Sequence, residues 1–247
     1  MNRIKDYSEL EASIVKWLGD YVLENPSIKA FVIGVSGGID SAVSSTLAAK
    51  TGLPVYAIGM PIHQNKEQES LSDVHLKWLS DNFKNVTILK YDLTEVFETF
   101  KSAMKGYDND NHALANTRSR LRMVTLYQVS ASVSGLVVGT GNKVEDYGVG
   151  FYTKYGDGGI DIAPIADLYK TEVWILGEHL GVDERIISAS PTDGLWDDGR
   201  TDEDQIGASY ADLEYAMEYG TGSAVEILSK FNNQNKHKMQ PIPTFKL

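Results

Sequence analysis

The segment Ser36-Gly37-Gly38-Ile39-Asp40-Ser41 combines glycines, hydroxyls and a carboxylate. It follows the apolar run 30–35, which is typical of a strand buried on both faces, and it opens a predicted helix over 41–50. Ligands of α/β sheets bind at the carboxyl ends of such strands, where glycines let the backbone approach closely and a helix N-terminus attracts phosphate. No Gly-Lys-Ser/Thr follows, so this is not the common P-loop. We expect a nucleotide site of another type.

Asp40 predicts a cation at this site. A carboxylate beside a phosphate would repel it unless Mg²⁺ lay between them. The alternative interpretation is a tight strand-to-helix turn capped by the aspartate, which the paired glycines disfavour. A second apolar run, 136–140, ends in Thr140, which is placed to reach a nucleotide. Glu145 follows as the expected second metal ligand, with Asp146 as the fallback, although a lone loop glutamate is usually just solvated.

Basic side chains gather at two further places. Arg118, Arg120 and Arg122 lie near the start of a long predicted helix, with the first and third on one face. They suggest a contact with phosphates or a carboxylate, and the alternative is a solvated basic face. Lys170 stands at another predicted helix start, where a cation is unfavourable to the helix dipole unless a phosphate is present.

The stretch 151–165 offers one cation and two acceptors on a backbone bent by glycines. Lys154 is the cation, and Asp157 and Asp161 are the acceptors. Taken alone, the Asp-Gly-Gly sequence would indicate only a turn.

Together these segments resemble the ATP pyrophosphatases, whose signature is Ser-Gly-Gly-x-Asp-Ser, and among them the ammonia-dependent NAD synthetase family. Residues 151–165, Pro191-Thr192-Asp193-Gly194-Leu195 and the terminal His237-Lys238 carry the second resemblance, which covers nearly the whole chain. It implies ATP contacts, Mg²⁺ ligands and contacts with deamido-NAD (nicotinate adenine dinucleotide). The implied ATP contacts are Gly34, Val35, Ser36, Gly37, Gly38, Ile39, Asp40, Ser41, Thr140, Lys170 and Thr192. The implied metal ligands are Asp40 and Glu145. The implied contacts with deamido-NAD are Arg120, Lys154, Asp161, His237 and Lys238.

The resemblance also implies a reaction and an assembly. The nicotinate carboxylate attacks the α-phosphorus of ATP, pyrophosphate leaves, and ammonia then displaces AMP to give NAD. Asp40 and Lys170 are the expected catalytic groups for the first step, and Asp157 is our candidate for taking the proton of ammonium. The rival role of Asp157 is to hold its turn through backbone hydrogen bonds. Members of the family are homodimers that bind the dinucleotide partly across the interface.

Strands and helices alternate along the chain, which predicts a doubly wound, mostly parallel α/β sheet with helices on both faces, Rossmann-like, in a single domain over 1–247. The expected strands are 30–35, 55–60, 86–89 and 136–140. The expected helices are 8–23, 41–50, 67–81, 94–105, 113–133, 170–180, 202–218 and 221–232, with 141–160 irregular. We expect loops 62–68 and 193–203 to order over bound ATP.

Composition restricts the alternatives. A net charge of −11 disfavours nucleic-acid binding, and the absence of cysteine excludes a cysteine nucleophile for releasing ammonia from glutamine. No stretch is long and apolar enough for a membrane span, so a cytoplasmic protein is expected. Two other classes stay open: an RNA-modifying relative, and a non-catalytic nucleotide-binding module. Equilibrium binding together with a pyrophosphate-release assay would separate an enzyme from a binder.

Overall fold

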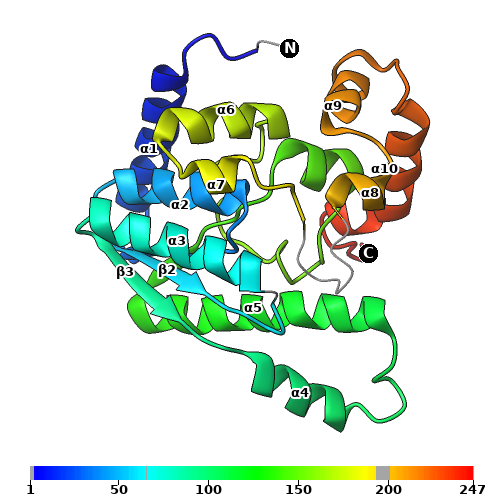
Figure 1. The fold of residues 1–247 in the computed structure, drawn as a ribbon, viewed down its shortest axis with the longest axis horizontal. Coiled ribbons are helices and arrows are strands. Elements are labelled where there is room, and N and C mark those ends of the chain that lie inside the picture. The colour runs from blue at the N-terminus through cyan, green and yellow to red at the C-terminus, as the bar shows by residue number, and fades with distance from the viewer. Residues whose placement is uncertain (1–2, 65, 193–200, 247) are drawn as a thin grey trace.

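A four-stranded parallel sheet forms the centre of the protein (Figure 1). The computed structural model describes residues 3–64, 66–192 and 201–246. Within them the strand order is β3 (Val86–Lys90), β2 (Val55–Gly59), β1 (Ala30–Gly34) and β4 (Gly135–Val137). The chain moves outward from β1 to β3 and then returns to the other side of β1 with β4. The carboxyl ends of β1 and β4 therefore flank the topological switch point, where ligands of such sheets bind.

Helices cover both faces of the sheet, which explains why β1 is apolar throughout (Figure 1). Phe31 and Ile33 point into a core shared with α1 (Tyr7–Glu24), α2 (Ile39–Lys50), α3 (Lys66–Asn82) and α6 (Lys170–Leu180). Val32 points to the opposite face, toward α4 (Thr94–Ala103) and α5 (Asn111–Val133). The short α7 (Glu184–Ile187) packs beside α2 and α6. The doubly wound α/β architecture predicted from the sequence is confirmed.

A further helical cluster packs on the segment that follows β4. The helices α9 (Tyr210–Tyr219) and α10 (Val225–Met239) pack on η1 (Lys143–Val149), a short π-helix, and α8 (Asp202–Ile206) joins them around a buried apolar core. These elements form the right-hand part of Figure 1. Across the described residues, no helix has the length and apolarity needed to cross a membrane.

Several elements differ from the sequence prediction. The helix expected over 202–218 is two helices, because Gly207 takes a left-handed φ of 84° and Ser209 caps a new start. The last helix runs from Val225 to Met239, well beyond the end expected at residue 232. The stretch 141–160 contains η1 instead of being wholly irregular.

Candidate active site

The loop after β1 is braced by its own serines. The Ser36 N–H donates to Ser41 Oγ at 3.1 Å, the Gly38 N–H donates to Ser36 Oγ at 3.2 Å, and Ser41 Oγ donates to the Gly38 carbonyl at 2.9 Å. Gly37 has a φ of 92°, which a side chain would strain. Gly38 caps α2 with no side-chain hydrogen bond, so the first N–H groups of α2 remain available to an anion.

Asn142 joins this loop to the segment after β4. The side chain is fully buried, and its oxygen accepts from the N–H groups of Val144 and Glu145 at 3.1 Å each, which starts η1. Its amide nitrogen donates to Asp40 Oδ1 at 3.2 Å. The same asparagine thus orients both carboxylates expected to hold a metal. Sequence reasoning missed it, although its place before an acidic helix start is a typical N-cap pattern.

Three charged side chains meet at the switch point. Lys170 Nζ lies 2.5 Å from Asp40 Oδ2 and 2.9 Å from Glu145 Oε1. The exposed fractions of the three side chains are 3% for Lys170, 16% for Asp40 and 14% for Glu145. A buried lysine between two carboxylates is costly to desolvate, and such an arrangement is a common mark of a functional site. We call Lys170, Asp40 and Glu145 the charge cluster.

Burial and mutual attraction set the ionisation of the charge cluster. Burial raises the pKa of Asp40 to about 6, and Glu145 adds to the rise, against the lowering by Lys170. Burial would also raise the pKa of Glu145, but contacts with Lys170, Tyr210 and Asn142 bring it below its usual range. Burial works against a charged lysine as well, yet the two carboxylates raise the pKa of Lys170. Lys170 is therefore a permanent cation here.

Tyr210 completes the surroundings of the charge cluster. Its hydroxyl donates to Glu145 Oε1 at 2.6 Å, and Lys170 Nζ lies 5.2 Å from the centroid of its ring. Burial raises the pKa of the tyrosine, and Glu145 and Asp202 raise it further. Sequence reasoning missed Tyr210 because it lies on α9, far along the chain, and no motif marks it.

The donor set of the charge cluster suits Mg²⁺ held jointly with phosphate. Asp40 and Glu145 converge on one cation, and carboxylate oxygens are ligands that Mg²⁺ prefers. Among residues 3–64, 66–192 and 201–246, no group of three or more His, Cys, Asp or Glu side chains could hold a metal alone. Substrate phosphates and water would have to supply the remaining ligands, which is the usual arrangement for Mg²⁺ with a nucleotide.

Asp146, the fallback for the metal, forms none of the ion pairs found for Lys170 among the described residues. Its carboxylate packs against the backbone of Gly141. Burial raises the pKa of Asp146 to about 8, with Glu145, Asp157 and Asp40 adding to the rise. The geometry thus favours Glu145 as the partner of Asp40.

The residues expected at deamido-NAD make the following contacts within the protein. Arg120 donates to the carbonyl of Lys154 at 3.3 and 3.4 Å, so these two cations are adjacent. Lys238 donates to the Tyr152 carbonyl at 2.5 Å, and His237 is exposed. Asp161 is already engaged, because Tyr127 Oη and the Val137 N–H both donate to it at 2.8 Å.

Asp157 holds its own turn. Ser119 Oγ donates to its carboxylate at 2.5 Å, and the Thr153 N–H donates to the same oxygen at 3.0 Å. These bonds favour the structural role over the transfer of a proton from ammonium. Lys238 lies close enough to lower the pKa of Asp157, although burial raises that pKa overall.

The other arginines of α5 serve the fold. Arg118 stacks over the ring of Phe97 at 5.0 Å. Arg122 donates to the Met60 carbonyl at 3.0 Å and to Gln64 Oε1 at 3.2 Å, which pins the turn after β2. Of the two loops expected to order over ATP, residues 65 and 193–200 lie outside the described residues. Thr140 lies between β4 and η1, and Thr192 is exposed beside the undescribed stretch.

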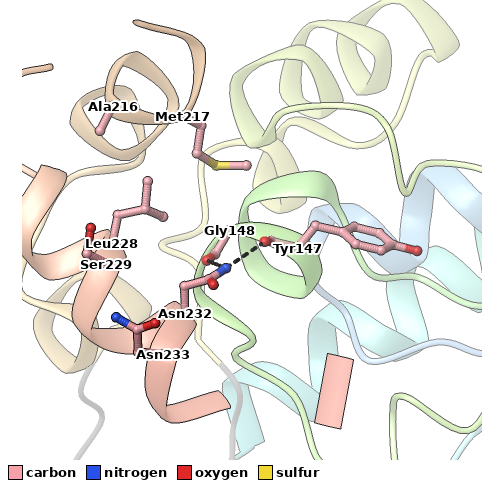
Figure 2. Close-up of a pocket in the computed structure, with 8 residues that line it drawn as sticks. All are labelled: Tyr147, Gly148, Ala216, Met217, Leu228, Ser229, Asn232 and Asn233. Carbon is pink, nitrogen blue, oxygen red and sulfur yellow. Dashed lines mark hydrogen bonds between the residues drawn. The ribbon is translucent and has the colours of Figure 1, made fainter. Parts of the chain in front are cut away.

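A pocket of about 350 Å³ opens between η1, α9 and α10 (Figure 2). Figure 2 shows the amide of Asn232 donating to the Tyr147 and Gly148 carbonyls at its edge, at 3.4 and 3.2 Å. Its lining contains none of the residues expected to bind ATP, metal or dinucleotide. The complete lining is Tyr147, Gly148, Ala216, Met217, Leu228, Ser229, Asn232 and Asn233.

Comparisons with known proteins agree on one family. The family model described as NAD synthase matches residues 10–244. An NH(3)-dependent NAD(+) synthetase of Carboxydothermus hydrogenoformans is 37% identical over 240 residues, covering 94% of this chain and 95% of its own. One from Thermococcus kodakarensis is 40% identical over 214 residues, covering 86% and 80%.

Two solved structures are also similar. The structure described as NMN synthetase from Francisella tularensis superposes with a TM-score of 0.91 at 33% identity, covering 99% of this chain and 100% of that one. An NH3-dependent NAD synthetase from Campylobacter jejuni gives a TM-score of 0.78 at 25% identity, covering 98% and 100%.

Proposed function

The chain belongs to the NAD synthase family, and from that premise we propose that it is a ligase that amidates deamido-NAD to NAD with free ammonia at the expense of ATP. The charge cluster at the switch point supports the proposal independently of family membership. It places a permanent cation and two carboxylates beside an open helix N-terminus, and these are the groups that an ATP phosphate chain with Mg²⁺ requires.

The first step forms an adenylated carboxylate. The N–H groups at the start of α2 and the ammonium of Lys170 neutralise the phosphates, while Asp40 and Glu145 are the side chains that would hold Mg²⁺. Bound there, Mg²⁺ would supply charge neutralisation on the phosphates. The nicotinate carboxylate forms a bond to the α-phosphorus, and the bond to pyrophosphate breaks. Lys170 leaves the carboxylates for the phosphates in this step.

The second step forms the amide. Ammonia attacks the acyl carbon of the adenylate, the bond to AMP breaks, and one proton is released. Arg120 and Lys154 position the dinucleotide, with Lys238 and His237 at the end of α10 as further contacts. The Asp157 carboxylate accepts from the N–H of Thr153, the residue before Lys154, and its role as proton acceptor competes with its hold on the turn.

A direct assay tests the activity. The purified protein is incubated with ATP, Mg²⁺, ammonium and deamido-NAD, and the products are separated by mass. We expect NAD, AMP and pyrophosphate in equal amounts. ATP binding without any pyrophosphate release, with deamido-NAD or with nicotinate mononucleotide, would instead identify a nucleotide-binding module.

Nicotinate mononucleotide is a second candidate substrate. The similarity to the structure described as NMN synthetase, with a TM-score of 0.91 against 0.78 for the Campylobacter NAD synthetase, favours it specifically. Both substrates carry the same nicotinate carboxylate, so the chemistry is unchanged. The ratio of kcat/KM for the two acids, measured in one preparation, decides between them.

The assembly and the location are also proposals. A homodimer in the cytoplasm, without a nucleic-acid partner, fits the family resemblance and the net charge of −11. Light scattering after size-exclusion chromatography gives the mass in solution, and a monomer at working concentration would refute the dimer.

A further inference from the structure

The hydroxyl of Tyr210 and the ammonium of Lys170 share one acceptor. Tyr210 Oη lies 2.6 Å from Glu145 Oε1, and Lys170 Nζ lies 2.9 Å from the same oxygen. The hydroxyl has a second neighbour in Asp202 Oδ2 at 3.3 Å, which is the longer contact. Because a phenol donates only one proton, the short bond to Glu145 takes it.

Contacts that do not involve Lys170 help to hold this hydroxyl in place. The Tyr210 side chain is 1% exposed and meets Trp174 edge-on, with ring centroids 5.8 Å apart. The backbone N–H of Tyr210 donates to Glu203 Oε1 at 2.8 Å, which ties the start of α9 to α8. Contacts with Trp174 of α6 and Glu203 of α8 therefore hold Tyr210 in place, and the bond to Glu145 joins α9 to the charge cluster.

The two partners of Glu145 differ in what happens when ATP binds. Lys170 is proposed to move to the phosphates, and Glu145 then loses its ammonium partner. Asp40 still has the amide of Asn142 at 3.2 Å, and Glu145 keeps the short hydrogen bond from the Tyr210 hydroxyl at 2.6 Å beside its contact with Asn142. Outer partners of this kind typically contribute about 10- to 100-fold in metal affinity or activity.

We propose that Tyr210 is a positioning residue, whose hydroxyl holds Glu145 in the orientation that receives the metal of the ATP complex. It acts through Glu145 and touches neither substrate. The inference rests on the proposed function, since it takes Glu145 as a metal ligand. It also gives α8 and α9 a part in the site, because α9 carries the hydroxyl and Glu203 of α8 accepts from the N–H at the start of α9.

Tyr210→Phe tests the proposal by removing the hydroxyl and keeping the ring. Mn²⁺ affinity is measured by electron paramagnetic resonance with a non-hydrolysable ATP analogue, and the apparent Mg²⁺ requirement by steady-state turnover. We expect both to weaken by about 10-fold or more, while the KM for deamido-NAD and kcat at saturating Mg²⁺ stay within about 3-fold. A merely structural role would not produce this separation.

Tyr169→Phe is the matched control. It also loses a buried hydroxyl that donates to a glutamate, here Glu218 at 3.0 Å, but that glutamate lies outside the charge cluster. We expect its Mn²⁺ affinity to equal that of the wild type. Equal losses in the two variants, or an unchanged Mn²⁺ affinity in Tyr210→Phe, would overturn the proposal.

A double-mutant cycle keeps the test decisive if Tyr210→Phe is unstable. In a Glu145→Gln background the tyrosine substitution should have no further effect on Mn²⁺ affinity, because its only route to the metal is gone. An additional loss there would refute the proposed route.

Wild-type protein that binds Mn²⁺ with the ATP analogue but makes no amide would refute the proposed function, while the positioning role of Tyr210 would still stand. Wild-type protein that shows no nucleotide-dependent Mn²⁺ binding would refute this inference.

Discussion

At the scale of single residues, Lys170 occupies the position that a metal would need. Its ammonium contacts both Asp40 and Glu145, at 2.5 and 2.9 Å, so a divalent cation must compete with it. ATP offers the lysine another partner and supplies further ligands to the metal. The structure therefore predicts that Mg²⁺ enters together with ATP and binds weakly without it.

Lys170→Met should reveal this competition. The substitution leaves two carboxylates close together without their cation, and we expect Mn²⁺ to bind without nucleotide and to raise the thermal midpoint of the variant more than that of the wild type. Turnover should fall by about 100-fold or more, because a cation at the phosphates is lost. Lys143→Met, which removes an ion pair with the exposed Asp167, is the control. If Mn²⁺ without nucleotide raised the thermal midpoint of Lys170→Met no more than that of the wild type, the proposed competition between Lys170 and the metal would be contradicted.

Asp40→Asn and Glu145→Gln should each abolish turnover with little change in the free energy of unfolding. Each removes the charge of one proposed metal ligand, yet each leaves Lys170 with its other carboxylate. Pyrophosphate release and the thermal midpoint are measured on the same preparations. Asp146→Asn should retain turnover, and the reverse pattern for Glu145 and Asp146 would transfer the metal role to Asp146.

At the scale of elements, the sequence predicted the sheet and the loop after β1 well. Apolar strands such as 30–35 and glycines at a fixed place are local signals, and a parallel sheet brings the ends of β1 and β4 together. The other side chains around the charge cluster arise from distant contacts. Asn142 is 102 residues from Asp40, and Tyr210 is 65 residues from Glu145, so no short pattern could join them.

Tertiary contacts also explain the elements that were wrong. The asparagine run in 232–235 has weak helix propensity, but Asn232 and Asn235 donate to the carbonyls of Gly148 and Val149, which holds α10 in place. Lys154 and Arg120 could be placed side by side only by the structure. Their roles in binding stay predictions.

The contact between α2 and α3 predicts acid sensitivity. His75 is fully buried, bonded to Ser45 at 2.9 Å and stacked on Trp78, and burial lowers its pKa to about 4. The unfolded chain binds a proton below its ordinary pKa of about 6.5, and the folded protein does so only near 4. The free energy of unfolding should therefore fall as pH drops through this range, by up to about 1.4 kcal/mol per pH unit.

Urea unfolding at several pH values measures this slope. His75→Gln removes the titrating group, so its slope should be shallower than that of the wild type, whatever the stability of the variant at pH 7. His112→Gln, at an exposed position, should keep the wild-type slope. Identical slopes for the wild type and His75→Gln would show that His75 does not carry the effect.

At the scale of the whole molecule, the absence of cysteine predicts the nitrogen source. Release of ammonia from glutamine usually needs an activated cysteine, and this chain contains none. The purified chain should use ammonium, with rates that rise with pH as free ammonia increases, and should gain nothing from glutamine. Glutamine supporting a comparable rate, in a preparation free of glutaminase, would overturn this prediction.

Adenylation of the nicotinate carboxylate is the step on which the proposed function depends. Deamido-NAD labelled with ¹⁸O in its carboxylate tests this most directly, with ATP, Mg²⁺ and ammonium, because the oxygen lost from the carboxylate must leave with the group that activated it. The account predicts that the amide product forms together with AMP that carries one ¹⁸O in its phosphate, and that pyrophosphate is unlabelled. Formation of ADP together with labelled inorganic phosphate would contradict it.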